Sequence, residues 1–246
     1  MLVAAAVVPS APLLIPSVAA GAAHELDELR AHCWEAIDVL QQSEPDVLVV
    51  VGGGDTAAVA YPGAKGTMRG YGDPTDVALP GQRHSALPEL LGRLPAQTNL
   101  PLSLTIAAWL LQEAEVQLPL VGLIQPFSIT CREAEEYGQT LSTVAPRVAV
   151  LAVGDGSAAL SRRSPMYIVS GAEQWQGSVT AAFASGDRQA LLALRELDGE
   201  QYGASGRGVW QTMVGGFTEH SVKASVRADL APYGVAYLVA TWVAAA

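Results

Sequence analysis

Short, uninterrupted runs of apolar residues predict strands that are buried on both faces. Leu2 to Val8 is one such run and Val47 to Val51 is another. A strand with one wet face alternates apolar and polar residues, so runs of this kind favour a parallel sheet that is covered on both sides. The stretch 46–56, DVLVVVGGGDT, predicts the central strand, followed by a sharp turn through its three glycines, 52 to 54.

Helical spacing of apolar residues alternates with these runs. Helices are predicted over residues 23–42, 87–93, 102–111, 130–144 and 170–185. Thr130 with Glu133, and Ser170 with Glu173, have the spacing of a capping box at a helix start. Asp187 is placed to cap one further helix.

The end of the chain predicts an antiparallel hairpin. Residues 222–230 alternate strictly between apolar and polar side chains, 231–234 (APYG) predict a turn, and 235–243 return as a buried strand. Strands are also predicted at 118–124 and 147–153, and the Gly- and Pro-rich stretch 57–84 predicts short strands and a long loop. The fold class is therefore three-layer α/β, with a mixed, mostly parallel central sheet and helices on both faces.

Composition narrows the class of protein. The 246 residues are half hydrophobic, carry a net charge of -10 and include only two lysines, Lys65 and Lys223. We expect a single domain, residues 1–246, that binds neither nucleic acid nor a membrane surface. Two cysteines, Cys33 and Cys131, make neither a disulfide framework nor a zinc spacing, which favours a cytoplasmic protein.

Polar residues follow the predicted parallel strands at the end where α/β proteins bind ligands. Ser10 follows the first strand, Asp55 follows the central strand, and Asp155 follows the strand 147–153. Either aspartate can bind a divalent ion or act as a base, although Asp155 is equally suited to capping its own turn. His84, in the long loop, is a candidate metal ligand or a surface residue.

Three segments carry a resemblance to a known superfamily. VVPSAPLLIP at 7–16, DVLVVVGGG at 46–54 and GDGSAAL at 154–160, in this order and spacing, resemble the class III extradiol ring-cleavage dioxygenases, the LigB-type and Memo-like proteins. The ending PYGVAYLVA at 232–240 is similar to the final strand of that superfamily. The resemblance implies one extradiol dioxygenase-like domain over nearly the whole chain.

The resemblance also implies where a metal site would lie. Active members hold Fe(II) with two histidines and one glutamate, and a third histidine serves as acid and base. The two metal histidines correspond to Ser10 and Gly54 here, and the acid-base histidine, which follows Gly-Asp-x-Ser, corresponds to Ala158. The glutamate corresponds to Glu200 or Ala204.

These substitutions predict loss of the family reaction. Serine is a poor iron ligand, and glycine and alanine offer no side-chain donor, so we expect no bound cofactor and no ring cleavage. The pocket at Ser10, Gly54, Asp55, Asp155, Ser157 and Ala158 is then a site for a small molecule or a protein partner. The alternative is a metal-dependent dioxygenase or hydrolase in which Asp55, Asp155, His84 or Glu200 hold Fe(II) or another divalent ion. A homo-oligomer is a third expectation, because oligomers are common in this superfamily.

Overall fold

The protein, described by a computed structural model over residues 1–84, 86–217 and 221–245, is built around a mixed sheet. Its centre has four parallel strands: β1 (Leu2–Val8), β2 (Val47–Gly54), β7 (Pro119–Pro126) and β8 (Val148–Val153). They lie in the order β7-β2-β8-β1, with β2 paired in parallel to both β7 and β8. The apolar run at 47–51 is therefore in a central strand, as predicted.

Antiparallel strands extend this centre on both sides. Beyond β1 lie β10 (Tyr237–Ala244) and then β9 (Val222–Leu230), which form the predicted C-terminal hairpin. Beyond β7 lie β3 (Ala58–Thr67) and β4 (Asp76–Ala78). The short strands β5 (Gln82–Arg83) and β6 (Ala96–Asn99) pair in parallel with β7 and β3. The predicted sheet class is confirmed.

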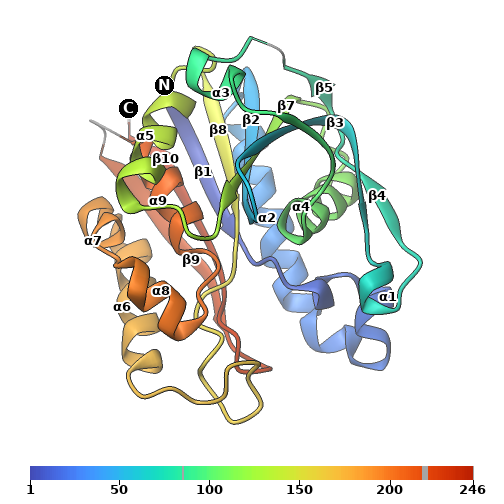
Figure 1. Ribbon diagram of the computed structural model, residues 1–246, viewed down its shortest axis with the longest axis vertical. Helices are drawn as coiled ribbons and strands as arrows, with labels where there is room; N and C mark the ends of the chain where they lie inside the picture. The colour runs from blue at the N-terminus through green and yellow to red at the C-terminus, as the bar shows by residue number, and fades with distance from the viewer. Residues whose placement is uncertain (85, 218–220, 246) are drawn as a thin grey trace.

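Helices cover both faces of the sheet (Figure 1). One face packs against α2 (Asp27–Gln42) and α4 (Leu102–Glu113), and the other packs against α5 (Cys131–Leu141), α6 (Ala172–Ser185) and α9 (Arg207–Gly215). Successive side chains of a strand point to opposite faces, so Leu48 joins the first core while Val49 joins the second. This is why Gln125, near the end of β7, is the one polar side chain in the four central strands. The other helices are short: η1 (Pro12–Leu14), α1 (Pro16–Ala19), η2 (Ala20–Leu26), η3 (Arg69–Tyr71), α3 (Glu89–Gly92), α7 (Arg188–Leu192) and α8 (Glu196–Tyr202).

Strand β2 runs farther than its sequence predicted. Gly52, Gly53 and Gly54 pair in parallel with β7, and none has a positive φ, so the predicted turn through these glycines is wrong. Steric crowding explains instead why these positions are glycine. A Cβ on Gly52 would lie 2.4 Å from the Ser103 hydroxyl oxygen, and a Cβ on Gly53 would lie 2.4 Å from the Phe127 ring.

The stretch 57–84 also has more strand than predicted. Residues 58–67 form one strand, β3, which pairs first with β7 and then with β4. Its pairing with β6 shifts register between Ala60 and Lys65, and Gly63 within that interval has a φ of +92°. The Pro and Gly residues therefore bend the strand without ending it.

Only one of the two predicted capping boxes is present. Thr130 caps α5, with reciprocal hydrogen bonds between Thr130 and Glu133, and Asp187 caps α7 through the backbone N–H of Ala190. Ser170 does not cap α6. That helix begins after Gly171, whose left-handed φ of +88° sets the direction of entry and leaves Ser170 outside the first turn.

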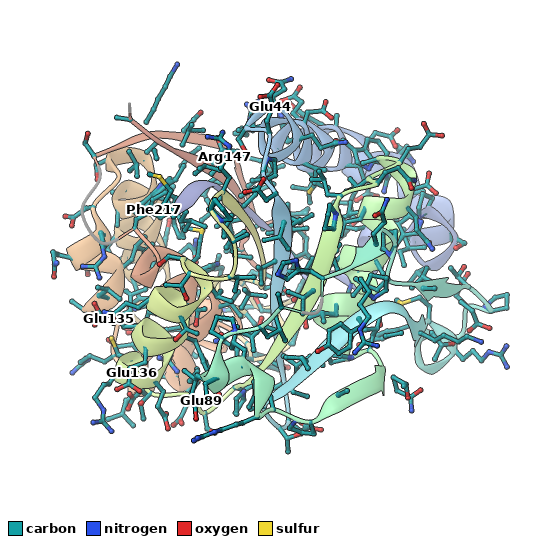
Figure 2. The ribbon with its side chains drawn as sticks, turned by 90° about the horizontal axis from the view of Figure 1, so that it is seen from above. Glu44, Glu89, Glu135, Glu136, Arg147 and Phe217 are labelled. Carbon is teal, nitrogen blue, oxygen red and sulfur yellow. The ribbon has the colours of Figure 1, made fainter. Side chains whose placement is uncertain are left out.

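Polar contacts tie the amino ends of the parallel strands to the preceding loops. Arg147, just before β8, donates from Nε to the carbonyl oxygen of Glu44 at 2.9 Å, and its backbone N–H donates to Asp46 at 2.8 Å. Figure 2 looks onto this end of the sheet and shows Arg147 beside Glu44. The carboxyl ends lie on the opposite side of the molecule. Within the described ranges, no helix has both the length and the apolar character needed to cross a bilayer.

Candidate functional site

A pocket of about 370 Å³ lies at the carboxyl ends of the parallel strands. It brings together the loop after β1, the end of β2, the loop after β8, the turn after α8 and the start of β10. Its walls are mostly apolar, with a few polar groups that converge on one side, as is usual for small-molecule sites. The lining residues are Ser10, Ala11, Pro12, Leu13, Gly53, Leu102, Ser103, Phe127, Val153, Asp155, Ala158, Pro165, Gly203, Ser205, Val235 and Tyr237.

Asp155 is the only charged residue among those that line this pocket. Both of its carboxylate oxygens accept hydrogen bonds from Ser10: Oδ1 from the backbone N–H at 2.8 Å, and Oδ2 from the hydroxyl at 2.8 Å. The side chain thus joins the loops after the neighbouring strands β1 and β8 at the wall of the pocket. It does not cap its own turn, which was the alternative prediction for this residue.

The backbone of Asp155 is fixed as well. Its N–H donates to the Ser205 hydroxyl at 3.1 Å, and its carbonyl oxygen accepts from the N–H of Gly206 at 2.8 Å. The two loops approach so closely that a Cβ on Gly154 would lie 2.5 Å from the Cα of Gly206. The carboxylate is therefore held in place by backbone packing as well as by hydrogen bonds.

Burial raises the pKa of Asp155 to about 6, while the two hydrogen bonds from Ser10 act in the opposite direction. Desolvation has the larger effect because none of the described residues that line the pocket is a lysine or an arginine, which would stabilise the charge. At neutral pH the group is a carboxylate that can accept a proton within one or two pH units. Such a group can serve as a counter-ion or as an acid and base.

Tyr237 places a phenol beside this carboxylate. The residue is 4% exposed, and its pKa is raised by burial and then by the negative charge of Asp155. Tyr233 donates from its hydroxyl to Glu25, whereas no hydrogen bond joins the Tyr237 hydroxyl to any described residue. A neutral phenol that lines the pocket in this way is available to a ligand.

The structure brings Ser10, Asp155 and Ala158 into the pocket, but not every residue predicted for it. Gly54 does not line the pocket: a Cβ there would lie 2.6 Å from the side chain of Ile124, and Gly53 faces the pocket instead. Ser157 is fully buried, with its hydroxyl donating to the carbonyl oxygen of Tyr202 at 3.2 Å. Its role is to hold the loop after β8.

Glu200 and Ala204 line an adjoining compartment of about 300 Å³, not the pocket itself. The two compartments share Phe127, Gly203 and Ser205, so they are neighbouring parts of one depression. Glu200 is exposed and Ala204 is buried. Because both residues lie in the same compartment, both correspondences with the superfamily's glutamate stay open.

Asp55 and His84 lie apart from the pocket. Asp55 is exposed beyond the end of β2. His84 lies next to β5, where its backbone N–H donates to Leu120 near the amino end of β7, and its Nε2 is 3.1 Å from the carbonyl oxygen of Ala86. The convergence of Asp55, His84, Asp155 and Glu200 around one cavity, which the metal-enzyme alternative requires, is not found. More generally, in the part of the chain that the structure describes, no three His, Cys, Asp or Glu side chains form a group suited to a metal ion.

The residues around the pocket do not fit the iron centre that the resemblance implies. That centre needs two imidazole nitrogens and a carboxylate on one face of the ion. Among the described residues that line the pocket there is one carboxylate, already hydrogen-bonded to Ser10 through both oxygens, and no histidine. Its chemistry is that of a carboxylate, a phenol and hydroxyl groups in an apolar enclosure.

Sequence reasoning missed Tyr237, Ser205 and Phe127. Tyr237 falls within an apolar strand, so its pattern gave no sign that the hydroxyl meets a pocket. Ser205 follows a helix far along the chain, and only the close packing of Gly154 on Gly206 brings it to Asp155. Phe127 was detectable as an isolated aromatic residue just after a predicted strand; it is 57% exposed.

Comparisons with known proteins bear on the fold. No protein-family model and no curated protein matches this sequence. Among solved structures, the chain is similar to the crystal structure of uncharacterized protein JW3007 from Escherichia coli K12. The TM-score is 0.54 with 13% sequence identity, and the match covers 98% of this chain and 99% of that chain. At this identity the similarity concerns the fold alone.

Proposed function

We propose that this protein is an extradiol dioxygenase-like protein that does not cleave aromatic rings and that binds a small organic molecule in the pocket around Asp155. The observation that carries the proposal is the Ser10–Asp155 pair. At the position of a metal histidine, Ser10 uses its backbone N–H and its hydroxyl to bind the Asp155 carboxylate. That carboxylate is thereby oriented within an organic-ligand pocket.

The geometry of the pocket supports this function. The three segments that carry the superfamily resemblance contribute Ser10, Gly53, Asp155 and Ala158 to one cavity. A volume of about 370 Å³ with apolar walls and a few convergent polar groups is in the range of small-molecule sites.

The first experiment tests the absence of ring cleavage. The purified protein is loaded anaerobically with Fe(II) in a calorimeter and then mixed with a panel of catechols in air. We expect no stoichiometric Fe(II) binding and no ring-opened product by absorbance. Ring-opened product would contradict the proposal, and tight Fe(II) binding would favour the metal-dependent alternative with substituted ligands.

The second experiment tests the pocket itself. A fragment library is screened by ligand-observed NMR against the wild-type protein and against Ala158→Leu, which adds three carbon atoms at the pocket wall. Ala181→Leu, at an exposed position of α6, adds the same atoms away from the pocket. We expect hits that Ala158→Leu loses and Ala181→Leu keeps. Hits that are equally strong on all three proteins would place ligand binding elsewhere.

Exposed apolar residues near the pocket favour a second candidate function, the binding of a protein partner or of a second copy of the chain. Phe127, Met166, Tyr167 and Ile168 are 57%, 42%, 70% and 61% exposed. Phe127 lines the pocket, and the Met166 sulfur packs against Gly203, another lining residue. Light scattering coupled to gel filtration tests the second copy. A concentration-dependent dimer that Tyr167→Ser with Ile168→Ser dissociates is the expected result, and a monomer at all concentrations would contradict self-association.

A further inference from the structure

We propose that the ligand of this pocket is an organic ammonium ion, with its charged nitrogen beside Asp155 and its apolar body against the walls of the pocket. The inference rests on the proposed function, because it names the class of molecule that the same site takes.

The charges of the pocket carry this inference. Asp155 contributes one carboxylate, and none of the sixteen lining residues is a lysine, an arginine or a histidine. Ser10 donates two hydrogen bonds to the carboxylate but brings no positive charge. A desolvated carboxylate without a cation is poorly compensated, so a ligand that supplies the cation gains both the charge interaction and hydrogen bonds.

Tyr237 gives a second, independent reason to expect a polar ligand group at this position. Its side chain is nearly completely buried and lines the pocket, yet no described residue hydrogen-bonds to its hydroxyl. The phenol lies close enough to Asp155 for the negative charge of the carboxylate to raise the pKa of Tyr237. An ammonium group has several N–H donors, so it can donate to the carboxylate and to the phenol oxygen together.

The adjoining compartment favours a cation as well. Glu196 and Glu200 line it, with Arg207 as the one cationic residue among its lining. Arg207 is buried, and its guanidinium donates hydrogen bonds to Gln211 and to the carbonyl oxygen of Ile129. These bonds occupy the guanidinium, so it is not placed to bind an anionic ligand. An anionic ligand would therefore meet carboxylates in both compartments, and a cationic one would be attracted by both.

The walls define the rest of the ligand. Leu13, Leu102, Val153 and Val235 supply aliphatic surface, and Phe127 supplies an aromatic ring. A hydrocarbon body of roughly the size of a phenyl ring with a short chain suits a cavity of about 370 Å³.

The experiment compares three probes with the same apolar body: 2-phenylethylammonium, 2-phenylethanol and phenylacetate. Binding to the full-length protein is measured at pH 8 by calorimetry and by changes in the protein's NMR spectrum. We expect the ammonium to bind at least ten-fold more tightly than the alcohol, and phenylacetate to show no binding. In Asp155→Asn the ammonium and the alcohol should bind equally, while the affinity for the alcohol stays near that of the wild type.

Matched variants separate a specific contact from general attraction to an acidic protein. Asp55→Asn removes one negative charge outside the pocket and should leave the preference for ammonium unchanged. Tyr237→Phe should lower ammonium affinity several-fold and alcohol affinity less. If the alcohol binds the wild type as tightly as the ammonium does, the inference fails while the ligand pocket stands. If no probe binds and the fragment screen also gives no hit that Ala158→Leu removes, the proposed function fails with it.

Discussion

The carboxyl group of Asp155 couples the pocket to the stability of the fold. Its pKa rises from 3.8 to about 6 on folding, chiefly through burial. The folded state therefore keeps a proton that the unfolded chain releases, so this group's contribution is fully present below pH 3.8 and is lost as the pH rises through 6. This difference in pKa between the folded and unfolded states corresponds to at most about 3 kcal/mol in the free energy of unfolding. The partial exposure of Asp155 reduces that value.

Asp155→Asn should remove this dependence. The free energy of unfolding of the variant, relative to the wild type, is expected to rise between pH 4 and pH 7 and to stay constant above that. Urea unfolding of both proteins at several pH values measures it. Carboxylates whose pKa is lowered, such as Asp73, Asp76 and Glu133, titrate in both proteins and cancel in the comparison. A difference that does not vary with pH would contradict the account of Asp155.

Ser10→Ala tests the hydrogen bond that orients the carboxylate. The variant loses the hydroxyl donor and keeps the backbone donor, so the pKa of Asp155 should rise further, as one of its lowering contributions is gone. We expect a cost of about 1–2 kcal/mol in unfolding free energy at pH 8, where the carboxylate is charged. Titration of ¹³C-labelled aspartate carboxyls reports the pKa directly. Ser178→Ala, which removes an exposed hydrogen bond within α6, is the control and should leave the Asp155 titration in place.

For single residues, the sequence predicted which side chains lie at the pocket better than it predicted which side chains they contact. Ser10, Asp155 and Ala158 were predicted at strand ends and do meet in the pocket, because parallel strands bring their carboxyl ends together. The partner of Asp155 was not predictable, since Ser10 lies 145 residues away and no local pattern records that contact. For His84, given as a metal ligand or a surface residue, the sequence left the choice open for a related reason: loop length says nothing about which end of the sheet a loop reaches.

At the scale of elements, two glycines with opposite surroundings test the packing of the site. Gly154→Ala places a Cβ 2.5 Å from the backbone of Gly206, which cannot move aside as a side chain can. We expect a loss of about 1–3 kcal/mol in unfolding free energy and weaker binding in the pocket, because the loop that carries Ser205 must shift.

Gly177→Ala is the matched control. Gly177 lies inside α6, and a Cβ there meets nothing within 4 Å. Alanine should stabilise the helix by about 0.5–1 kcal/mol. Thermal and urea unfolding of the two variants should therefore move in opposite directions. Equal destabilisation by both substitutions would mean that chain flexibility, and not the contact between the two loops, decides the effect.

Most elements were predictable because their signals are local. The buried strands show as apolar runs, α5 shows its capping box, and the hairpin of β9 and β10 shows alternation and a turn. The errors lie where a glycine has a role that only tertiary packing reveals. Gly52 to Gly54 continue strand β2 by pairing with β7, and they are glycines because neighbouring side chains leave no room for a Cβ. Gly171 redirects the chain before α6.

At the scale of the molecule, the order of strands predicts how strongly each part resists opening. The strands β7, β2, β8 and β1 are buried on both faces and have paired neighbours, whereas β9 at one edge is largely half-buried or exposed along its length. Amide hydrogens in the four central strands can exchange only when the core opens, so they should exchange most slowly. Those of β9 and of the short strand β4 should exchange orders of magnitude faster.

The decisive amides are those of the glycine run. If Gly52 and Gly53 belonged to a turn, as their sequence alone suggests, their amides would exchange as fast as those of surface loops. Gly52 pairs in parallel with both β7 and β8, and Gly53 pairs with β7, so their amides should be protected to nearly the same degree as those of Val49 and Val50. Hydrogen exchange read by NMR at single-residue resolution distinguishes the two cases. Fast exchange at these glycines would contradict their place in β2. The pocket and the proposed ligand site depend on that strand end, because Gly53 lines the pocket.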